Sequence, residues 1–170
     1  LNFNVMFSQR GLYHLAHSVH DMQEITRRAY SNYLNGIDAE ILNQDQVKKN
    51  IPHMNVNGRY PVLGAILQRR AGTARHDAVA WGYARAAENL GVDIIQNCEV
   101  TGIDVSNGIV TGLQTTKGSV NAKKVGLVPA GHSSVLANMA GFRLPISSVP
   151  LQALVSEPIK PILDCVIMSN

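Results

Sequence analysis

Apolar residues recur at helical spacing in two long stretches of the chain. The first stretch follows Ser18, which with Asp21 three residues later is typical of a helix N-cap, and it ends at Asn35-Gly36. The second begins at His76 and ends at Gly91, and its apolar face carries Val79, Ala80, Tyr83, Ala87 and Leu90. Since His76 shares the face of Val79, Ala80 and Tyr83, we expect its ring to point inward.

Shorter patterns complete the expected elements. Asn43 predicts a cap for a short polar helix over 44–50, which Pro52 ends. The dipeptide Asn107-Gly108 suits a type I′ turn, so the runs 98–105, 109–116 and 119–121 predict a three-stranded meander. A helix is expected over 133–140, after Ala130-Gly131. Alternating or continuous apolar runs predict further strands over 1–7, 12–17, 60–68, 92–95, 124–128, from 151 onward and over 164–168.

The ends of the pattern suggest an internal piece of a longer protein. The chain begins at Leu1 inside an apparent strand, and the strand pattern of 164–168 is followed by no polar tail. We therefore expect both ends to be truncated, so that motifs missing here belong to flanking sequence.

Composition narrows the class of protein. The 170 residues allow about one domain of ordinary size, and 45% are hydrophobic while 16% are charged, which favours a globular fold over a disordered one. No apolar run approaches the roughly 18 residues of a membrane span, and no signal peptide is recognisable. Two cysteines without metal-ligand spacing fit a reducing, cytoplasmic setting and no metal site. The net charge is +3, and the basic residues fall in scattered pairs, whereas a nucleic-acid-binding surface would gather them in one cluster.

His76 is the first candidate for chemistry. It follows the basic loop 69–75, and the positive end of the helix that it begins disfavours the imidazolium form, which leaves a neutral, nucleophilic ring. Arg69, Arg70 and Arg75 could hold a phosphate together with the backbone N–H groups of the helix end. The plainer interpretation is a hydrogen-bonded histidine beside a solvated basic loop, and the spacing alone leaves both open.

Ala130-Gly131 is the second candidate. It joins an apolar run to a helix, an arrangement in which a glycine lets the backbone approach a ligand closely. A tight turn without a ligand explains the same residues, Pro129 is unusual at the end of a central strand, and no complete GxGxxG motif occurs in the chain. His14, His17 and His20 are spaced by three, but the first two fall in a predicted strand, so we expect no shared metal.

Five runs of sequence together carry a family resemblance. They closely resemble the beta subunits of heterotetrameric sarcosine oxidases, which are D-amino-acid-oxidase-like FAD-dependent oxidoreductases. The resemblance covers essentially the whole chain and rests on the runs 8–11, 68–70, 74–82, 139–142 and 150–157.

The resemblance implies a fold and a domain division. The fold class is α+β or α/β, a partial D-amino-acid-oxidase-like fold made of pieces of a split FAD-binding domain and a β-rich substrate domain. Residues 1–75 would belong mainly to the substrate domain, 76–141 to the FAD-binding domain, and 142–170 would return to the substrate domain.

The resemblance also implies two flavins. FMN would be covalently linked to His76, and FAD would be bound noncovalently. Of the loop arginines named above, Arg70 and Arg75 are the candidates for contact with the cofactor. The strand at Glu99-Val100 would contact the adenine through its main chain, and the turn at Ala130 and Gly131 would approach the dinucleotide. Pro129 departs from the small residue expected before that turn.

The implied enzyme oxidises sarcosine to glycine and a formaldehyde equivalent, and reduces oxygen to hydrogen peroxide. Tetrahydrofolate can accept the one-carbon unit, and alpha, gamma and delta subunits would be partners. Two alternatives stay open. One is a single-flavin dehydrogenase or oxidase of dimethylglycine or another N-methyl amino acid, and the other is a non-catalytic subunit that keeps the fold.

Overall fold

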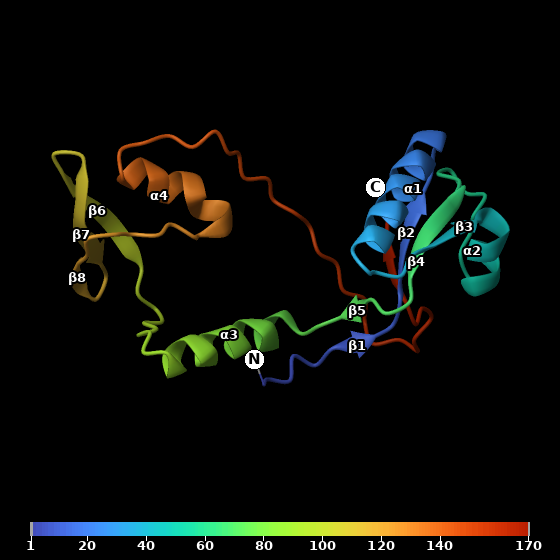
Figure 1. Cartoon of the computed structure of the whole chain (residues 1–170), viewed down its shortest axis with the longest axis horizontal. Helices are drawn as coiled ribbons and strands as arrows, with labels where there is room; N and C mark the ends of the chain where they lie inside the picture. Colours follow the sequence, from blue (N-terminus) through green and yellow to red (C-terminus); the bar gives the residue numbers. More distant parts are fainter. Residues whose placement is uncertain (1, 170) are drawn as a thin grey trace. The chain divides into compact units, whose positions relative to one another are not determined.

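A mixed four-stranded sheet organises the first part of the computed structural model, which describes residues 2–169 (Figure 1). The chain divides into two units, and each is described here by itself. The first contains the residues up to Val92 and those from Pro158, and the second is Asp93–Glu157. The strand order in the first unit is β3-β4-β2-β9, formed by Glu40–Asn43, Gly64–Gln68, Leu12–Ala16 and Val166–Met168.

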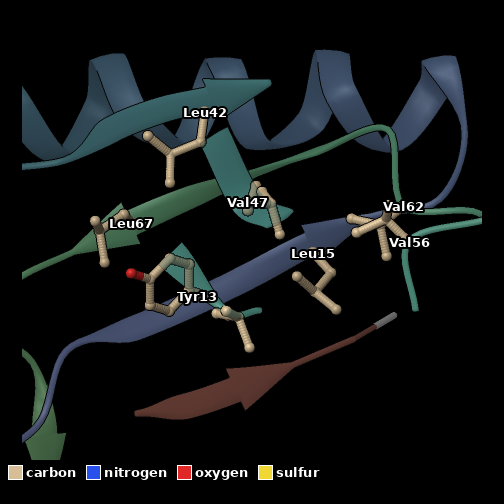
Figure 2. Packing of buried hydrophobic residues seen from close by; sticks show 9 residues of the cluster. Tyr13, Leu15, Leu42, Val47, Val56, Val62 and Leu67 are labelled. Atoms are coloured by element: carbon tan, nitrogen blue, oxygen red, sulfur yellow. The ribbon is translucent and has the colours of Figure 1, made fainter. Parts of the chain in front are cut away.

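Helices cover both faces of this sheet, because successive apolar residues of its strands point to opposite faces. On one face Ala16 and Ile66 pack with Ile25 and Ala29 of α1 (Val19–Leu34). The opposite face packs against Val47 of α2 (Gln44–Asn50) and the loop after it (Figure 2). The buried cluster on this opposite face contains Tyr13, Leu15, Leu42, Val47, Ile51, Val56, Val62, Ala65 and Leu67.

The expected caps are confirmed. The Ser18 hydroxyl accepts the Asp21 N–H, and Gly36 has a φ of 71° after α1. At α2, Asn43 and Gln46 form a reciprocal capping box. The last strand, β9, pairs in parallel with β2, which joins residues 154 positions apart at Leu12 and Val166.

The first unit also contains a two-stranded ribbon and a third helix. Strand β1 (Ser8–Gln9) pairs antiparallel with β5 (Gly72–Thr73), and α3 spans His76–Asn89. No helix within residues 2–169 is both long and apolar enough to cross a membrane.

The second unit holds the predicted meander. Strands β6 (Val100–Ser106), β7 (Ile109–Thr115) and β8 (Gly118–Asn121) form one antiparallel sheet. Asn107 and Gly108 both have positive φ angles, 52° and 76°, as a type I′ turn requires. A 3₁₀ turn, η1 (Ala130–His132), then leads into α4 (Ser133–Met139).

Several expected strands are absent from the described residues. The segments 2–7, 92–95, 124–128 and 151–157 form no strand, and the run 60–68 forms one only from Gly64 onward. Residue 1 lies outside the described range. These segments are apolar enough for a strand but have no ladder partner; Leu154 and Val155, for example, are each 95% exposed. A hydrophobic run specifies a strand only when another strand lies beside it.

The class is a mixture of α and β structure, as expected. The two units meet in sequence at 92/93 and 157/158, whereas the sequence placed its domain boundaries at 75/76 and 141/142. The assignment of these segments to FAD and substrate domains stays a prediction.

Candidate functional site

The loop before α3 is fixed by backbone pairing with the start of the chain. The Ala71 carbonyl accepts the N–H groups of Arg10 and Gly11, at 3.1 and 2.8 Å, and the Arg75 N–H donates to the Val5 carbonyl at 3.1 Å. Gly72 allows this approach, because a Cβ there would lie 2.0 Å from the Ser8 carbonyl oxygen. The start of α3 is therefore held at a defined position in the first unit.

His76 is the first residue of α3, and its side chain is exposed. The expectation that it points inward is wrong. The face that it shares with Val79, Ala80 and Tyr83 is largely uncovered, and Tyr83 is 65% exposed. The helix packs instead through Gly82, where a Cβ would lie 2.8 Å from the Phe3 ring. Among the described residues no hydrogen bond reaches the His76 ring, so both ring nitrogens are accessible.

A bidentate ion pair flanks His76. Arg75 Nε and Nη2 donate to the two carboxylate oxygens of Asp77, at 3.1 and 2.8 Å, and Asp77 Oδ1 also accepts the Ala78 N–H at 2.9 Å. The bond from Arg75, with help from the Ala78 N–H, lowers the pKa of Asp77, and Asp77 raises the pKa of Arg75. The pair balances charge beside the imidazole and leaves Arg75 Nη1 available as a donor.

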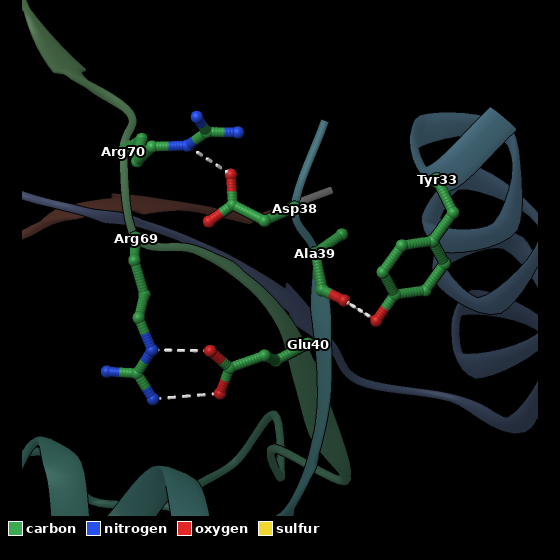
Figure 3. A network of polar contacts seen from close by, with 6 residues as sticks. All are labelled: Tyr33, Asp38, Ala39, Glu40, Arg69 and Arg70. Atoms are coloured by element: carbon green, nitrogen blue, oxygen red, sulfur yellow. Dashed lines mark hydrogen bonds and ion pairs between the residues drawn. The ribbon is translucent and has the colours of Figure 1, made fainter. Parts of the chain in front are cut away.

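The two other arginines of the loop are paired with β3 and the residues before it (Figure 3). Arg70 Nε donates to Asp38 Oδ1 at 2.6 Å, and Arg69 forms a bidentate pair with Glu40 in which Nη2 and Oε2 are 2.8 Å apart. These bonds lower the pKa values of Asp38 and Glu40. Arg70 thus has a carboxylate partner 32 residues away in sequence, and its two terminal nitrogens make no hydrogen bond among the described residues.

A cavity of about 440 Å³ lies on a different face of α3 from His76. Sequence reasoning missed it, although the i, i+4, i+8 spacing of Asp77, Trp81 and Arg85 marks a common helix face. Its wall includes Phe3, over whose ring the Arg85 guanidinium lies at 5.8 Å. The lining residues are Phe3, Asn4, Met6, Arg75, Asp77, Ala78, Trp81 and Arg85.

In the second unit, Val100 lies on the edge strand β6. The residue before it, Glu99, uses both backbone groups toward β7: Thr116 N–H donates to its carbonyl at 3.0 Å, and its own N–H donates to Thr116 Oγ1 at 3.1 Å. Backbone groups of successive strand residues face opposite edges. The N–H and C=O of Val100 therefore face the unpaired edge of the sheet.

The turn at Ala130 and Gly131 is also open to a ligand. Ala130, not Gly131, takes the left-handed conformation, with a φ of 49°, directly after Pro129. A Cβ built on Gly131 would meet nothing within 4 Å. Among the described residues, neither the Ala130 nor the Gly131 N–H donates a hydrogen bond. Successive free N–H groups in such a conformation form an anion-binding concavity.

The three spaced histidines do not converge. His14 is buried and bonded to Arg28 at 2.8 Å, while the ring of the half-buried His17 bonds to the Pro61 carbonyl and the Ser169 hydroxyl. No cluster of three or more His, Cys, Asp or Glu side chains within residues 2–169 could hold a metal ion.

Comparison with known families decides the class of this chain. The model of the FAD dependent oxidoreductase family matches residues 1–168. The chain belongs to this family.

Three curated proteins illustrate the sequence similarity of this chain. Sarcosine oxidase subunit beta of Rhodobacter capsulatus is 56% identical over 171 residues, covering 100% of this chain and 41% of that protein. The Arthrobacter protein of the same name is 55% identical, covering 100% and 42%. Human mitochondrial sarcosine dehydrogenase is 30% identical over 132 residues, covering 75% and 14%. The chain thus spans about two-fifths of the bacterial proteins that it resembles.

Solved structures share the fold of this chain. L-proline dehydrogenase from P. horikoshii matches with a TM-score of 0.77 at 20% identity, covering 98% of this chain and 44% of that one. Glycine oxidase from Geobacillus kaustophilus matches with a TM-score of 0.67 at 17% identity, with the same coverage.

The residues of the second unit fit the cofactor of an FAD dependent oxidoreductase. Val100 offers backbone groups at a free sheet edge, and Ala130 and Gly131 offer unbonded N–H groups beside open space. Main-chain contacts of this kind suit a dinucleotide, because they need no particular side chain.

Proposed function

We propose that this chain is part of the beta subunit of a sarcosine oxidase that uses two flavins. Such an enzyme oxidises sarcosine to glycine and formaldehyde, or 5,10-methylenetetrahydrofolate, with formation of hydrogen peroxide. Support comes from the identity of 56% over the whole chain to a sarcosine oxidase beta subunit. The structural observation that carries the proposal is the exposed imidazole of His76, which stands at the start of α3 with no hydrogen bond to its ring from the described residues.

His76 is proposed as the covalent attachment point of FMN. A bond to a ring nitrogen requires a nitrogen that is free of protein partners and a neutral ring that can act as a nucleophile. The Arg75–Asp77 pair beside the ring is balanced in charge, so it places no net charge next to the imidazole. The exposed Ala80 and Tyr83 and the half-buried Val79 on the same helix face would pack against the flavin ring.

The flavin phosphate would bind nearby. Arg75 precedes His76 directly and keeps Nη1 free after pairing with Asp77, so it can donate to a phosphate oxygen without losing that pair. Arg70 remains a candidate through its terminal nitrogens, but its pairing with Asp38 directs its Nε toward residues before β3.

FAD is proposed to bind noncovalently to the second unit. Val100 would contact the adenine through its backbone groups, and the turn at Ala130 and Gly131 would approach the dinucleotide. Val100, Ala130 and Gly131 would hold FAD and His76 would hold FMN, and the two flavins together would supply the chemistry that carries an electron pair from the amine to oxygen. The part of this chain is to hold the two groups in fixed positions.

The partners follow from the same proposal. We propose alpha, gamma and delta subunits as partners, sarcosine, oxygen and tetrahydrofolate as small-molecule reactants, and a cytoplasmic location. A single-flavin dehydrogenase of an N-methyl amino acid is the second candidate, and the 30% identity to human sarcosine dehydrogenase favours it specifically. The third is a non-catalytic subunit that has lost its flavin.

Peptide mass tests the role of His76. The subunit that carries this chain is co-expressed with its partners and digested with trypsin, which releases residues 76–85 because arginines stand at 75 and 85. We expect this peptide to carry the mass of FMN less two hydrogens.

The control is a second exposed histidine. His76→Gln should remove the adduct, and His20→Gln should leave it in place. An unmodified peptide from flavin-replete protein would contradict the proposal and favour the single-flavin candidate. A protein without any flavin absorption would favour the non-catalytic subunit.

A further inference from the structure

The turn at Ala130 and Gly131 is held by two serine hydroxyls. Ser133 Oγ donates to the Ala130 carbonyl at 2.7 Å, and Ser148 Oγ donates to the Gly131 carbonyl. We call Ser133 and Ser148 the serine clamp. Both residues lie in the second unit, one at the start of α4 and the other 17 positions from Gly131 in sequence.

The first hydroxyl sets the direction of a free donor. A peptide unit is planar and trans, so the Gly131 N–H points opposite to the Ala130 carbonyl. That carbonyl accepts both the backbone N–H and the hydroxyl of Ser133, on the side of α4. The Gly131 N–H is therefore directed away from the helix, where a Cβ on the same residue would meet no atom within 4 Å.

The second hydroxyl fixes the next peptide unit. The His132 N–H donates to the Pro129 carbonyl at 3.1 Å, and Ser148 holds the Gly131 carbonyl at the other end of the same plane. Rotation of this unit would break both bonds. Without the hydroxyl of Ser148, this peptide unit keeps the His132 N–H bond but loses the side-chain bond that holds the Gly131 carbonyl.

Ser148 reaches the turn because a hydrogen bond from α4 holds the segment in which it lies. Ser134 Oγ donates to the Ile146 carbonyl at 3.0 Å, two residues before Ser148. The bonds of Ser134 and Ser148 run in opposite directions between the start of α4 and residues 146–148. This reciprocal pairing places an exposed, irregular segment against the turn, although that segment lies outside both η1 and α4.

We propose that Ser148 is a positioning residue for dinucleotide binding. By holding the Gly131 carbonyl, it keeps the turn in the conformation that presents the free N–H groups of Ala130 and Gly131 to FAD. The inference rests on the proposed FAD contact of this turn. It adds a residue that neither the glycine turn nor a sequence motif indicates.

FAD titration of the assembled apoenzyme tests this role. Ser148→Ala should raise the dissociation constant of FAD about threefold to tenfold, as loss of one positioning hydrogen bond predicts. The effect should lie in the affinity for FAD, which the titration measures directly, because the hydroxyl acts on the occupancy of the site. Ser148→Thr keeps a hydroxyl and should restore affinity to within about twofold of the parent.

Ser147→Ala is the matched control, since Ser147 is exposed and its hydroxyl makes no hydrogen bond within the described chain. An unchanged FAD affinity in Ser148→Ala, or an equal loss in Ser147→Ala, would overturn the inference. If Ser148→Ala does not fold, Ser148→Cys keeps the volume with a weaker donor and should show an intermediate loss. A parent enzyme that binds no FAD would instead overturn the proposed FAD site. The titration of the parent therefore distinguishes failure of the FAD site from failure of the role of Ser148.

Discussion

Among the residues that the structure describes, Asp21 bonds only to those that lie within four positions of it in the sequence. Its N–H donates to Ser18 Oγ at 3.1 Å, while its carboxylate accepts the His17 N–H at 3.0 Å. A glutamate at this position in a capping box reaches back to the cap residue. The shorter aspartate reaches the residue before the cap, and these bonds, first that from His17, lower the pKa of Asp21.

The lowered pKa gives a pH-dependent prediction. Because the folded-state pKa of Asp21 lies below its ordinary value of 3.8, its contribution is complete above that value and is lost as the pH falls through the lower folded-state pKa. We expect Asp21→Asn to lower the free energy of unfolding at pH 7, and the difference from the parent to shrink below pH 3.8. Urea unfolding of the subunit across this range measures it.

Glu157→Gln serves as the control because Glu157 is exposed and makes no ion pair among the described residues. A difference between parent and Asp21→Asn that stays constant down to the lowest accessible pH would contradict the assigned role of the carboxylate.

At the scale of elements, close approach decides where strand β4 begins. The sequence predicted a strand from Tyr60, but the ladder starts at Gly64, which pairs with Ala16 on one side and Asn43 on the other. A Cβ on Gly64 would lie 2.4 Å from the Leu42 carbonyl oxygen and 2.8 Å from Met22 Sδ. This glycine lets β3 and α1 meet β4 at the same point.

Gly64→Ala should therefore overpack the sheet. The new methyl group meets backbone that cannot move freely, so we expect a loss of about 1–3 kcal/mol in the free energy of unfolding. Gly58→Ala is the matched control, since its Cβ would come no closer than 3.5 Å to Asn55. Equal unfolding midpoints in urea for the two variants would show that the contact at Gly64 does not limit packing.

At the scale of the whole molecule, the chain leaves its first unit and returns to it. Strand β9 brings the segment after Pro158 back to β2, so the first unit is built from two separate stretches of sequence. The connection before the return, 150–158, forms neither helix nor strand, and Leu151, Leu154 and Val155 are each at least 93% exposed.

In limited proteolysis, this connection should be cleaved first. Thermolysin cleaves before large apolar residues, and an exposed irregular segment fits its active site more readily than the buried strands do. We expect the earliest cuts in the chain at 151–155. The C-terminal piece should then stay bound through the parallel pairing of β9 with β2 and through the packing of Cys165 and Ile167 on the core.

Native mass spectrometry of the nicked chain checks this outcome. Early cuts inside β2 or β4, or immediate dissociation of the piece that carries β9, would contradict the described arrangement of the first unit.

The sequence by itself determined the elements whose signals are local. The caps at Ser18 and Asn43, the Asn107-Gly108 turn and the meander around it depend on residues a few positions apart, and the structure contains all of them. The family was also readable from short runs such as 74–82, because these runs are specific as sequence.

Only the tertiary structure decided what depends on distant partners. The apolar runs at 124–128 and 151–157 read as strands, but a strand exists only beside another, and no residue in the described range pairs with them. His76 was expected inside because its helix face is apolar, yet burial depends on what covers that face. Arg70 pairs with Asp38, and Ser148 with Gly131, across separations that no local pattern encodes.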